Sequence, residues 1–105
     1  MDAIEVTTFK LTSGLTIDDF VAANADVDAW LLRQPSFVSR RIAQRGDGVV
    51  VDLLIWASVR DGETAAARLM DELAASPVHA AIDQFTVSWT VSTVHHRLLP
   101  SATKR

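Results

Sequence analysis

Cysteine is absent from this chain of 105 residues, which contains only four glycines and three prolines. Without cysteine the protein can form neither a disulfide framework nor a thiolate metal site. No stretch approaches the roughly 20 apolar residues of a membrane span, and no segment is rich enough in Gly, Pro or Ser to predict a linker. Phosphate-binding glycine loops, nucleophile elbows, Mg²⁺-binding acidic clusters and zinc spacings are also missing. These absences argue against nucleotide-dependent and hydrolytic chemistry.

Positive charge is scarce as well, since ten Lys and Arg residues face thirteen Asp and Glu residues, giving a net charge of −3. We therefore expect no nucleic-acid partner. The N-terminal Met-Asp-Ala-Ile-Glu lacks the features of a signal peptide, and we expect a cytoplasmic protein with no membrane partner. Apolar residues make up 49% of the chain, which predicts one globular domain over residues 1–105, with a loose tail at 98–105.

The most informative stretch is the unbroken apolar run from Val49 to Trp56, which contains one carboxylate, Asp52. Its short length and its β-branched residues predict a strand. Apolar residues at nearly every position need cover on both faces, so we expect this strand to be central in its sheet. Because an unpaired buried charge is costly, we predict that Asp52 is ionised and pairs with an arginine, either Arg40 or one from a partner chain.

A turn signal, Gly46-Asp47-Gly48, precedes this run and predicts a hairpin with a strand over residues 37–45. In the expected register Ile42 lies opposite Asp52. One face of the hairpin then carries Arg40, Ile42, Gln44, Val50, Asp52, Leu54 and Trp56, and the other carries Ser39, Arg41, Ala43, Val49, Val51, Leu53 and Ile55.

Capping residues and hydrophobic periodicity define the other elements. Thr16 is a good N-cap with Asp19 three residues later, and it predicts a helix that runs to about Gln34, before Pro35. Ser58 predicts the start of a second long helix. A strand is expected over 4–11, a short helix over 77–83 and a last strand over 85–95.

The order β-α-β-β-α-β predicts an α+β, ferredoxin-like fold, in which a four-stranded antiparallel sheet has its helices on one face. The strands over 4–11 and 49–56 should be central. The more apolar set of side chains should lie under the helices. It comprises Val49, Val51, Leu53, Ile55, Val87 and Trp89.

The opposite face of the sheet is half apolar, with Val6, Thr8 and Val50 among its members. An uncovered apolar face commonly marks a partner surface, and a second copy of the chain would cover it. We therefore predict a homodimer, whose interface contains Arg40, Asp52, Leu54 and Trp56.

Four short segments resemble one known superfamily: Thr8–Leu11 in the first strand, Gln34–Ser39 leading into the second, Trp56–Ser58 before the second long helix, and Ser76–His79 before the last strand. Over residues 6–94 the chain resembles the dimeric α+β barrel superfamily, which includes the antibiotic-biosynthesis monooxygenases. These segments are marks of a fold, and none of them is a catalytic signature.

The resemblance implies a dimeric α+β barrel with a ligand pocket between helices and sheet in each subunit. It also implies cofactor-independent oxidation of a small aromatic or polyketide-like substrate, with no cofactor. The alternative is a module that binds a small apolar or aromatic ligand without catalysis. The haem-degrading branch is excluded, because its Trp and His positions hold Leu73 and Asp83 here and the first strand has no Asn.

Four residues are candidates for contacts with a substrate in that pocket. Asn24 interrupts an apolar helical stripe, and its amide either bonds to the backbone or faces the pocket. His79 could move a proton, because histidine is the side chain suited to proton transfer at physiological pH, although most such histidines are inert. Arg41 either extends past the sheet edge or binds an anionic group. Trp89 belongs to the core or to a pocket wall.

No residue stands out in the sequence as a metal ligand or as a catalytic base. His95 and His96 are neighbours in a predicted strand, so their side chains point to opposite faces and do not share one ion easily. We therefore expect no metal site.

Overall fold

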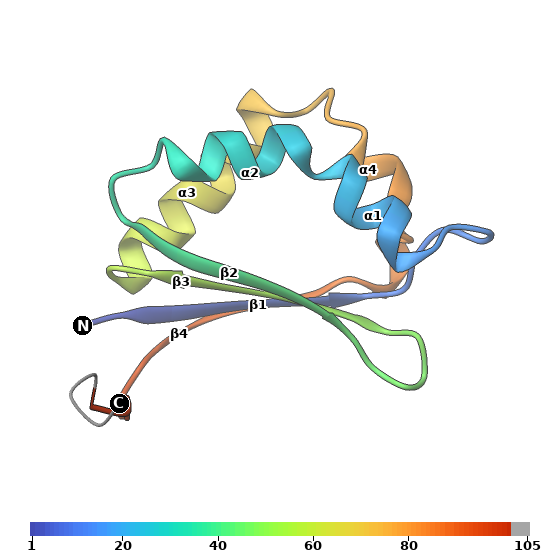
Figure 1. The fold of residues 1–105 in the computed structure, drawn as a ribbon. Coiled ribbons are helices and arrows are strands. Elements are labelled where there is room, and N and C mark those ends of the chain that lie inside the picture. The colour runs from blue at the N-terminus through green and yellow to red at the C-terminus, as the bar shows by residue number, and fades with distance from the viewer. Residues whose placement is uncertain (102–105) are drawn as a thin grey trace.

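Four antiparallel strands form an open sheet, and helices cover one of its faces in the computed structural model, which describes residues 1–101 (Figure 1). The spatial order of the strands is β2-β3-β1-β4, so the predicted central pair is confirmed, as is the ferredoxin-like α+β fold. The sheet of one chain does not close on itself. The strands are β1 (Ala3–Phe9), β2 (Phe37–Gln44), β3 (Val50–Trp56) and β4 (Ser88–Thr93).

The first predicted helix is divided into α1 (Ile17–Ala23) and α2 (Ala25–Leu32). The capping box at its start is confirmed, since Asp19 N–H donates to Thr16 Oγ1 at 3.1 Å and Thr16 N–H donates to Asp19 Oδ2 at 2.9 Å. The division falls at Asn24, which leaves the helical conformation with φ −92° and ψ 7°. A single helix over 17–34 was therefore a wrong prediction.

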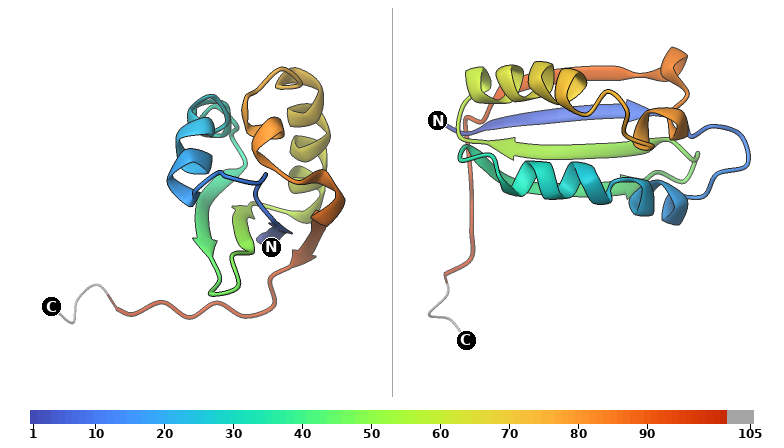
Figure 2. Two further views of the ribbon diagram at one scale, coloured as in Figure 1. Left: turned by 90° about the vertical axis from the view of Figure 1, so that its right-hand side faces the viewer. Right: turned by 90° about the horizontal axis from the view of Figure 1, so that it is seen from above.

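The second long helix, α3 (Val59–Glu72), begins after Ser58 as predicted, and Asp61 N–H donates to Ser58 Oγ at 3.1 Å. A short helix α4 (Val78–Ala81) and a 3₁₀ turn η1 (Gln84–Thr86) lead into β4. Seen from above, α1 and α2 lie along the β2 side of the sheet and α3 lies along the β4 side (Figure 2).

The hairpin of β2 and β3 has the predicted register, with Ile42 opposite Asp52. Arg45 N–H donates to the carbonyl oxygen of Val49 at 2.8 Å and closes the turn. Gly48 in that turn has φ +88°, a conformation that favours glycine over residues with a side chain.

The orientation of this hairpin is opposite to the prediction. Val50 and Trp56 are almost fully buried, and they lie with Asp52 and Leu54 under the helices. The set predicted to lie there, Val49, Val51, Leu53 and Ile55, takes no part in the buried core. Arg40, Asp52, Leu54 and Trp56, predicted on the uncovered face, are on the covered one.

Two neighbouring strands have the predicted orientation. Val87 and Trp89, before and in β4, line the helix side of the sheet. Val6 and Thr8 of β1 are only partly buried and pair with Leu53 and Val51 across the ladder. Because directly paired residues share a face, the uncovered face of the central strands is largely apolar. Its members are Ile4, Val6, Thr8, Val51, Leu53 and Ile55.

The chain after β4 leads away from the sheet (Figure 2), and residues 94–101 form neither helix nor strand. Leu98 and Leu99 are exposed. The predicted loose tail at 98–105 falls partly outside the described residues. Within residues 1–101, no helix has the length and apolar character that crossing a membrane requires.

Candidate functional site

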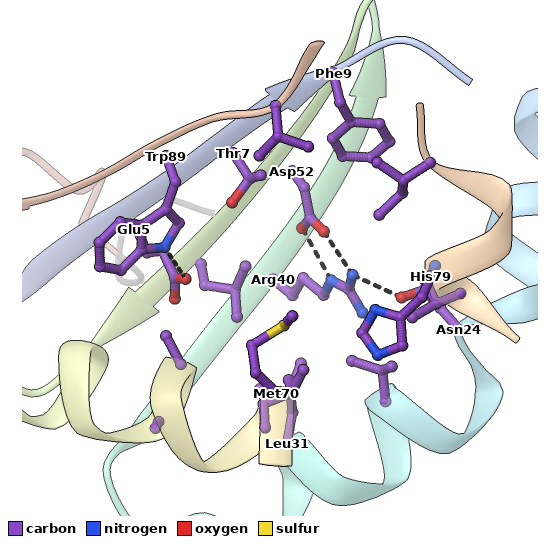
Figure 3. Close-up of a pocket in the computed structure, with 18 of the residues that line it drawn as sticks. Glu5, Thr7, Phe9, Asn24, Leu31, Arg40, Asp52, Met70, His79 and Trp89 are labelled. Carbon is purple, nitrogen blue, oxygen red and sulfur yellow. Dashed lines mark hydrogen bonds and ion pairs between the residues drawn. The ribbon is translucent and has the colours of Figure 1, made fainter. Parts of the chain in front are cut away.

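A cavity of about 460 Å³ lies between the helices and the covered face of the sheet. A cavity of this size, mainly apolar with a few convergent polar groups, is typical of a small-molecule site. Figure 3 shows side chains from the sheet and from the helices converging on it. The apolar side chains of its wall include Phe9, Phe20, Val27, Leu31, Leu54 and Met70.

A polar cluster centred on Arg40 forms one part of the cavity wall (Figure 3). Arg40 in β2 donates to both carboxylate oxygens of Asp52 in β3, from Nε at 3.0 Å and from Nη2 at 2.6 Å. It also donates to Asn24 Oδ1 at 2.8 Å and to Asp28 Oδ1 at 2.8 Å. The predicted pairing of Asp52 with Arg40 is confirmed, and the cluster joins the sheet to α1 and α2.

Arg40 keeps its charge despite its position in the wall. Burial lowers the pKa of Arg40, but the hydrogen bonds and negative charges of Asp52 and then Asp28 outweigh it and raise that pKa above its usual value. The side chains of Arg40 and Asp52 are only 10% and 11% exposed. Because two carboxylates already share the guanidinium, little positive charge remains for an anionic ligand.

The side chain of Asn24 is fully buried at the junction of α1 and α2. Its Nδ2 donates to the carbonyl oxygen of Phe20 at 2.8 Å while its Oδ1 accepts from Arg40. The two alternatives that the sequence left open are both correct, because the amide bonds to the helix backbone and also borders the cavity. This position at the end of α1 explains why a polar residue interrupts the apolar stripe.

A second polar group, Glu5 in β1, lies in the wall with only 7% of its surface exposed. One carboxylate oxygen accepts from Trp56 Nε1 at 2.8 Å, and the other accepts from Trp89 Nε1 at 2.7 Å. Figure 3 shows the Trp89 contact. Within residues 1–101, Glu5 takes part in no ion pair, unlike Asp52. The cavity thus has two buried carboxylates, one that a cation neutralises and one that accepts from indole N–H groups, and it is also lined by the exposed Glu63.

His79 in α4 also lines the cavity and is half-buried. Its Nε2 lies 2.8 Å from the carbonyl oxygen of Leu73. Since a carbonyl oxygen only accepts, Nε2 is the donor in this contact, and Nδ1 is the ring nitrogen left for other partners.

Three of the four predicted substrate contacts, Asn24, His79 and Trp89, come together around the cavity. Their role in binding stays a prediction. The fourth, Arg41, is exposed and lies outside the cavity, where its Nη1 donates to the carbonyl oxygen of Arg40 at 3.1 Å. The prediction that Arg41 faces the helices was wrong because the hairpin is turned over, which brings Arg40 into the cavity in its place.

Glu5 is the main residue that the sequence analysis missed. It stands between Ile4 and Val6 in a strand, and alternation with Val6 places it on the helix side, but nothing near it in the sequence indicates a partner for its carboxylate. Its two indole donors are far away in the sequence, so no local pattern identifies it. As for metals, no cluster of three His, Asp or Glu side chains suited to an ion occurs in the described part of the chain.

Comparison with known proteins identifies relatives of this fold. No protein-family model matches the chain, and no curated protein matches it in sequence. Among solved structures, SnoaB, a cofactor-independent oxygenase from Streptomyces nogalater, matches with a TM-score of 0.70 and 20% identity, over 95% of this chain and 98% of SnoaB.

Two further structures are similar. The monooxygenase ActVA-Orf6 of Streptomyces coelicolor, solved with Nanaomycin D, has a TM-score of 0.63 and 23% identity, over 94% of this chain and 92% of its own. Rv0793 from Mycobacterium tuberculosis has a TM-score of 0.64 and 13% identity, over 97% of this chain and 99% of Rv0793. The resemblance to antibiotic-biosynthesis monooxygenases is therefore confirmed at the level of the fold.

Proposed function

We propose that this protein is a homodimeric enzyme that oxidises a small aromatic or polyketide-like substrate with molecular oxygen and needs no cofactor. The observation that carries the proposal is the apolar cavity of about 460 Å³ with its few polar groups, in the fold that SnoaB and ActVA-Orf6 share. In such chemistry the carbanion of the substrate itself reacts with oxygen, so the protein must bind the substrate, remove a proton and exclude water.

The charges in the cavity favour a neutral substrate. Glu5, Asp52 and Glu63 supply three carboxylates, and the single guanidinium of Arg40 is already bonded to Asp52. A negatively charged ligand would meet an unbalanced carboxylate at Glu5. A flat, neutral aromatic molecule fits better, because the remaining wall is mainly apolar and offers dispersion contacts.

Three cavity residues form the proposed substrate site, two by contact with the substrate and one by positioning Arg40. Trp89 offers an aromatic surface, His79 offers Nδ1, and the buried amide of Asn24 holds Arg40 in position. Arg41 has no part in this proposal, because it is exposed on the other side of the sheet.

The direct test is oxygen consumption by the purified, chelator-treated protein in the presence of an anthrone, which is a neutral aromatic ketone with an acidic methylene group. We expect oxygen uptake above the uncatalysed rate and a quinone product by mass spectrometry. Tight binding without any oxygen uptake would instead identify a ligand-binding module. Absence of both binding and turnover for a panel of such aromatic ketones would contradict the proposed function.

The homodimer in this proposal rests on the uncovered face of the sheet. Val6, Leu53 and Ile55 lie there without helical cover. A second copy packed on this face would place two sheets face to face and bury these side chains, as in the dimeric α+β barrel that the resemblance implies. A cytoplasmic location completes the proposal and rests on the sequence alone.

A further inference from the structure

We propose that Glu5 is the catalytic base of the cavity, the group that removes a proton from the bound substrate. This inference rests on the proposed function and adds to it the residue that starts the reaction. Three observations support it: the position of Glu5, the hydrogen bonds that already occupy the other candidate bases, and the charge balance of the proton transfer.

Glu5 is held in a fixed orientation inside the cavity wall. Its two oxygens accept one indole N–H each, from Trp56 in β3 and from Trp89 in β4, at 2.8 and 2.7 Å. These donors lie on the two strands that flank β1, so the carboxylate is braced from both sides. An ionised carboxylate has about four lone-pair sites, and the indoles occupy two of them. Each oxygen therefore keeps one site that can accept a proton.

The other polar groups of the cavity are less suited to this role. Both oxygens of Asp52 accept from Arg40, so proton uptake there would break a buried ion pair. The Nε2 of His79 donates to the carbonyl oxygen of Leu73, so only its Nδ1 could accept a proton. Proton uptake there would create a new cation beside the carbanion, whereas uptake by Glu5 creates no additional charge. Glu63 also lines the cavity, but it is exposed. Among the cavity carboxylates in the described residues, Glu5 alone combines burial with freedom from a cation.

The proton transfer is balanced within the cavity. A C–H bond of the substrate breaks, its electron pair stays on the substrate as a carbanion conjugated with the neighbouring carbonyl, and a new O–H bond forms on Glu5. The negative charge passes from Glu5 to the substrate, so the number of charges in the cavity does not change. Molecular oxygen, the oxidant of the proposed function, then accepts electrons from the carbanion in a later step. General base catalysis of this kind typically contributes about 10²–10⁴-fold in rate.

Proton removal can be measured apart from oxidation. An anthrone is incubated with the protein in deuterated water without oxygen, and deuterium uptake at its methylene carbon is followed by mass spectrometry. For Glu5→Gln we expect this exchange to fall about 10²–10⁴-fold, and aerobic kcat to fall equally. We expect the Kd for an inert anthraquinone, measured by calorimetry, to change only a few-fold.

Two further variants separate catalysis from structural support. Glu72 also accepts an indole N–H, from Trp30 at 3.1 Å, and lies outside the cavity lining. Glu72→Gln therefore makes the same change from carboxylate to amide beside an indole, and it should leave the exchange rate unchanged. Glu5→Asp keeps a carboxylate and should recover part of the exchange that Glu5→Gln loses, whereas a residue that only braces the indoles would give equal losses for both.

The possible failures are distinguishable. If the Glu5→Gln variant exchanges deuterium at the same rate as the wild type, Glu5 is not the base. Oxidation by the wild type would then still support the proposed function. Equal exchange in Glu5→Gln and Glu5→Asp, both reduced, would also overturn the role of Glu5. If the wild-type protein neither exchanges nor oxidises any of the aromatic ketones, the proposed function fails and the assignment of a base fails with it.

Discussion

Arg40 and Asp52 meet as a two-point fork beneath the helices, with Nε–Oδ1 and Nη2–Oδ2 distances of 3.0 and 2.6 Å. This arrangement matches the planar guanidinium to the planar carboxylate and makes both hydrogen bonds charge-assisted. It allows β3 to bury a charged residue in its middle, because each charge is satisfied by the other.

Loss of the Asp52 carboxylate should destabilise the fold strongly. Asp52→Ala leaves Arg40 buried without its main partner, and breaking such a pair costs about 3–5 kcal/mol. Asp47→Ala is the matched control, since its contact with Arg45 is exposed and such pairs contribute about 0–1 kcal/mol. Asp52→Asn should also be costly, because it keeps the shape but loses the charge. Urea unfolding measures all three, and equal losses for Asp52→Ala and Asp47→Ala would contradict the importance of the fork.

Gly62 in α3 should resist replacement by alanine. A Cβ at this position would lie 2.9 Å from Cδ1 of Trp56 and 3.4 Å from Cγ1 of Val91. Alanine normally stabilises a helix by about 1 kcal/mol over glycine, but here the clash with a buried indole should outweigh that gain and lower the melting temperature. Thr64→Ala, at an exposed position of the same helix, should raise it slightly. A higher melting temperature for Gly62→Ala would show that α3 is not in close contact with Trp56.

The capping box at α1 should make stability depend on acidic pH. The hydrogen bonds from the backbone and side chain of Thr16 lower the pKa of Asp19 below its usual value. Because the folded-state pKa is lowered, the stabilisation is present above the usual aspartate pKa and disappears as pH falls through the folded value.

Asp19→Asn should therefore be less stable than the wild type near neutral pH, and the difference should shrink as the solution becomes more acidic. Asp18→Asn, in the same first turn, controls for the loss of one charge near the helix start. Denaturation curves at several pH values measure the effect. A difference that is constant with pH would contradict the capping role of the Asp19 carboxylate.

A charge on the uncovered face of the sheet should prevent dimer formation. Leu53→Lys places an ammonium group at the centre of the proposed interface. Its neighbours there, Val6 and Ile55, are apolar, so the buried charge would have no partner. Leu32→Lys is the matched control, because Leu32 is 78% exposed on α2 in the helical layer. Sedimentation should give a dimer for the wild type and for Leu32→Lys, and a monomer for Leu53→Lys. A wild-type monomer of about 11.5 kDa would contradict the homodimer.

Local signals in the sequence were sufficient for most of the secondary structure. The caps at Thr16 and Ser58 act on residues three positions away, and the turn at 46–48 fixes the register of β2 and β3. The order of the elements then leaves few topologies, because crossover connections have one hand. The break at Asn24 was missed, since this residue contacts Arg40 on another element and no local pattern reveals that contact.

The orientation of the hairpin could not be deduced from its own residues. Both faces of β3 are apolar, and the face without Asp52 is the drier, so hydrophobicity alone favours it as the core face. The protein buries the other one, and Arg40 neutralises Asp52 in the cavity wall, a pairing that the hydrophobicity of β3 does not reveal. The role of Glu5 also depends on distant residues, because its two hydrogen-bond donors lie 51 and 84 residues away in the sequence.

The three tryptophans divide into two at the cavity and one apart from it. Trp56 and Trp89 line the cavity and donate to Glu5, whereas Trp30 donates to Glu72 and has Arg68 over its ring at 5.5 Å. The chain contains no tyrosine, so its ultraviolet emission comes almost entirely from these indoles. An aromatic molecule that enters the cavity comes into contact with the first two indoles, so its binding should change their emission more than that of Trp30. The protein therefore carries its own fluorescent reporter of occupancy, without any attached label.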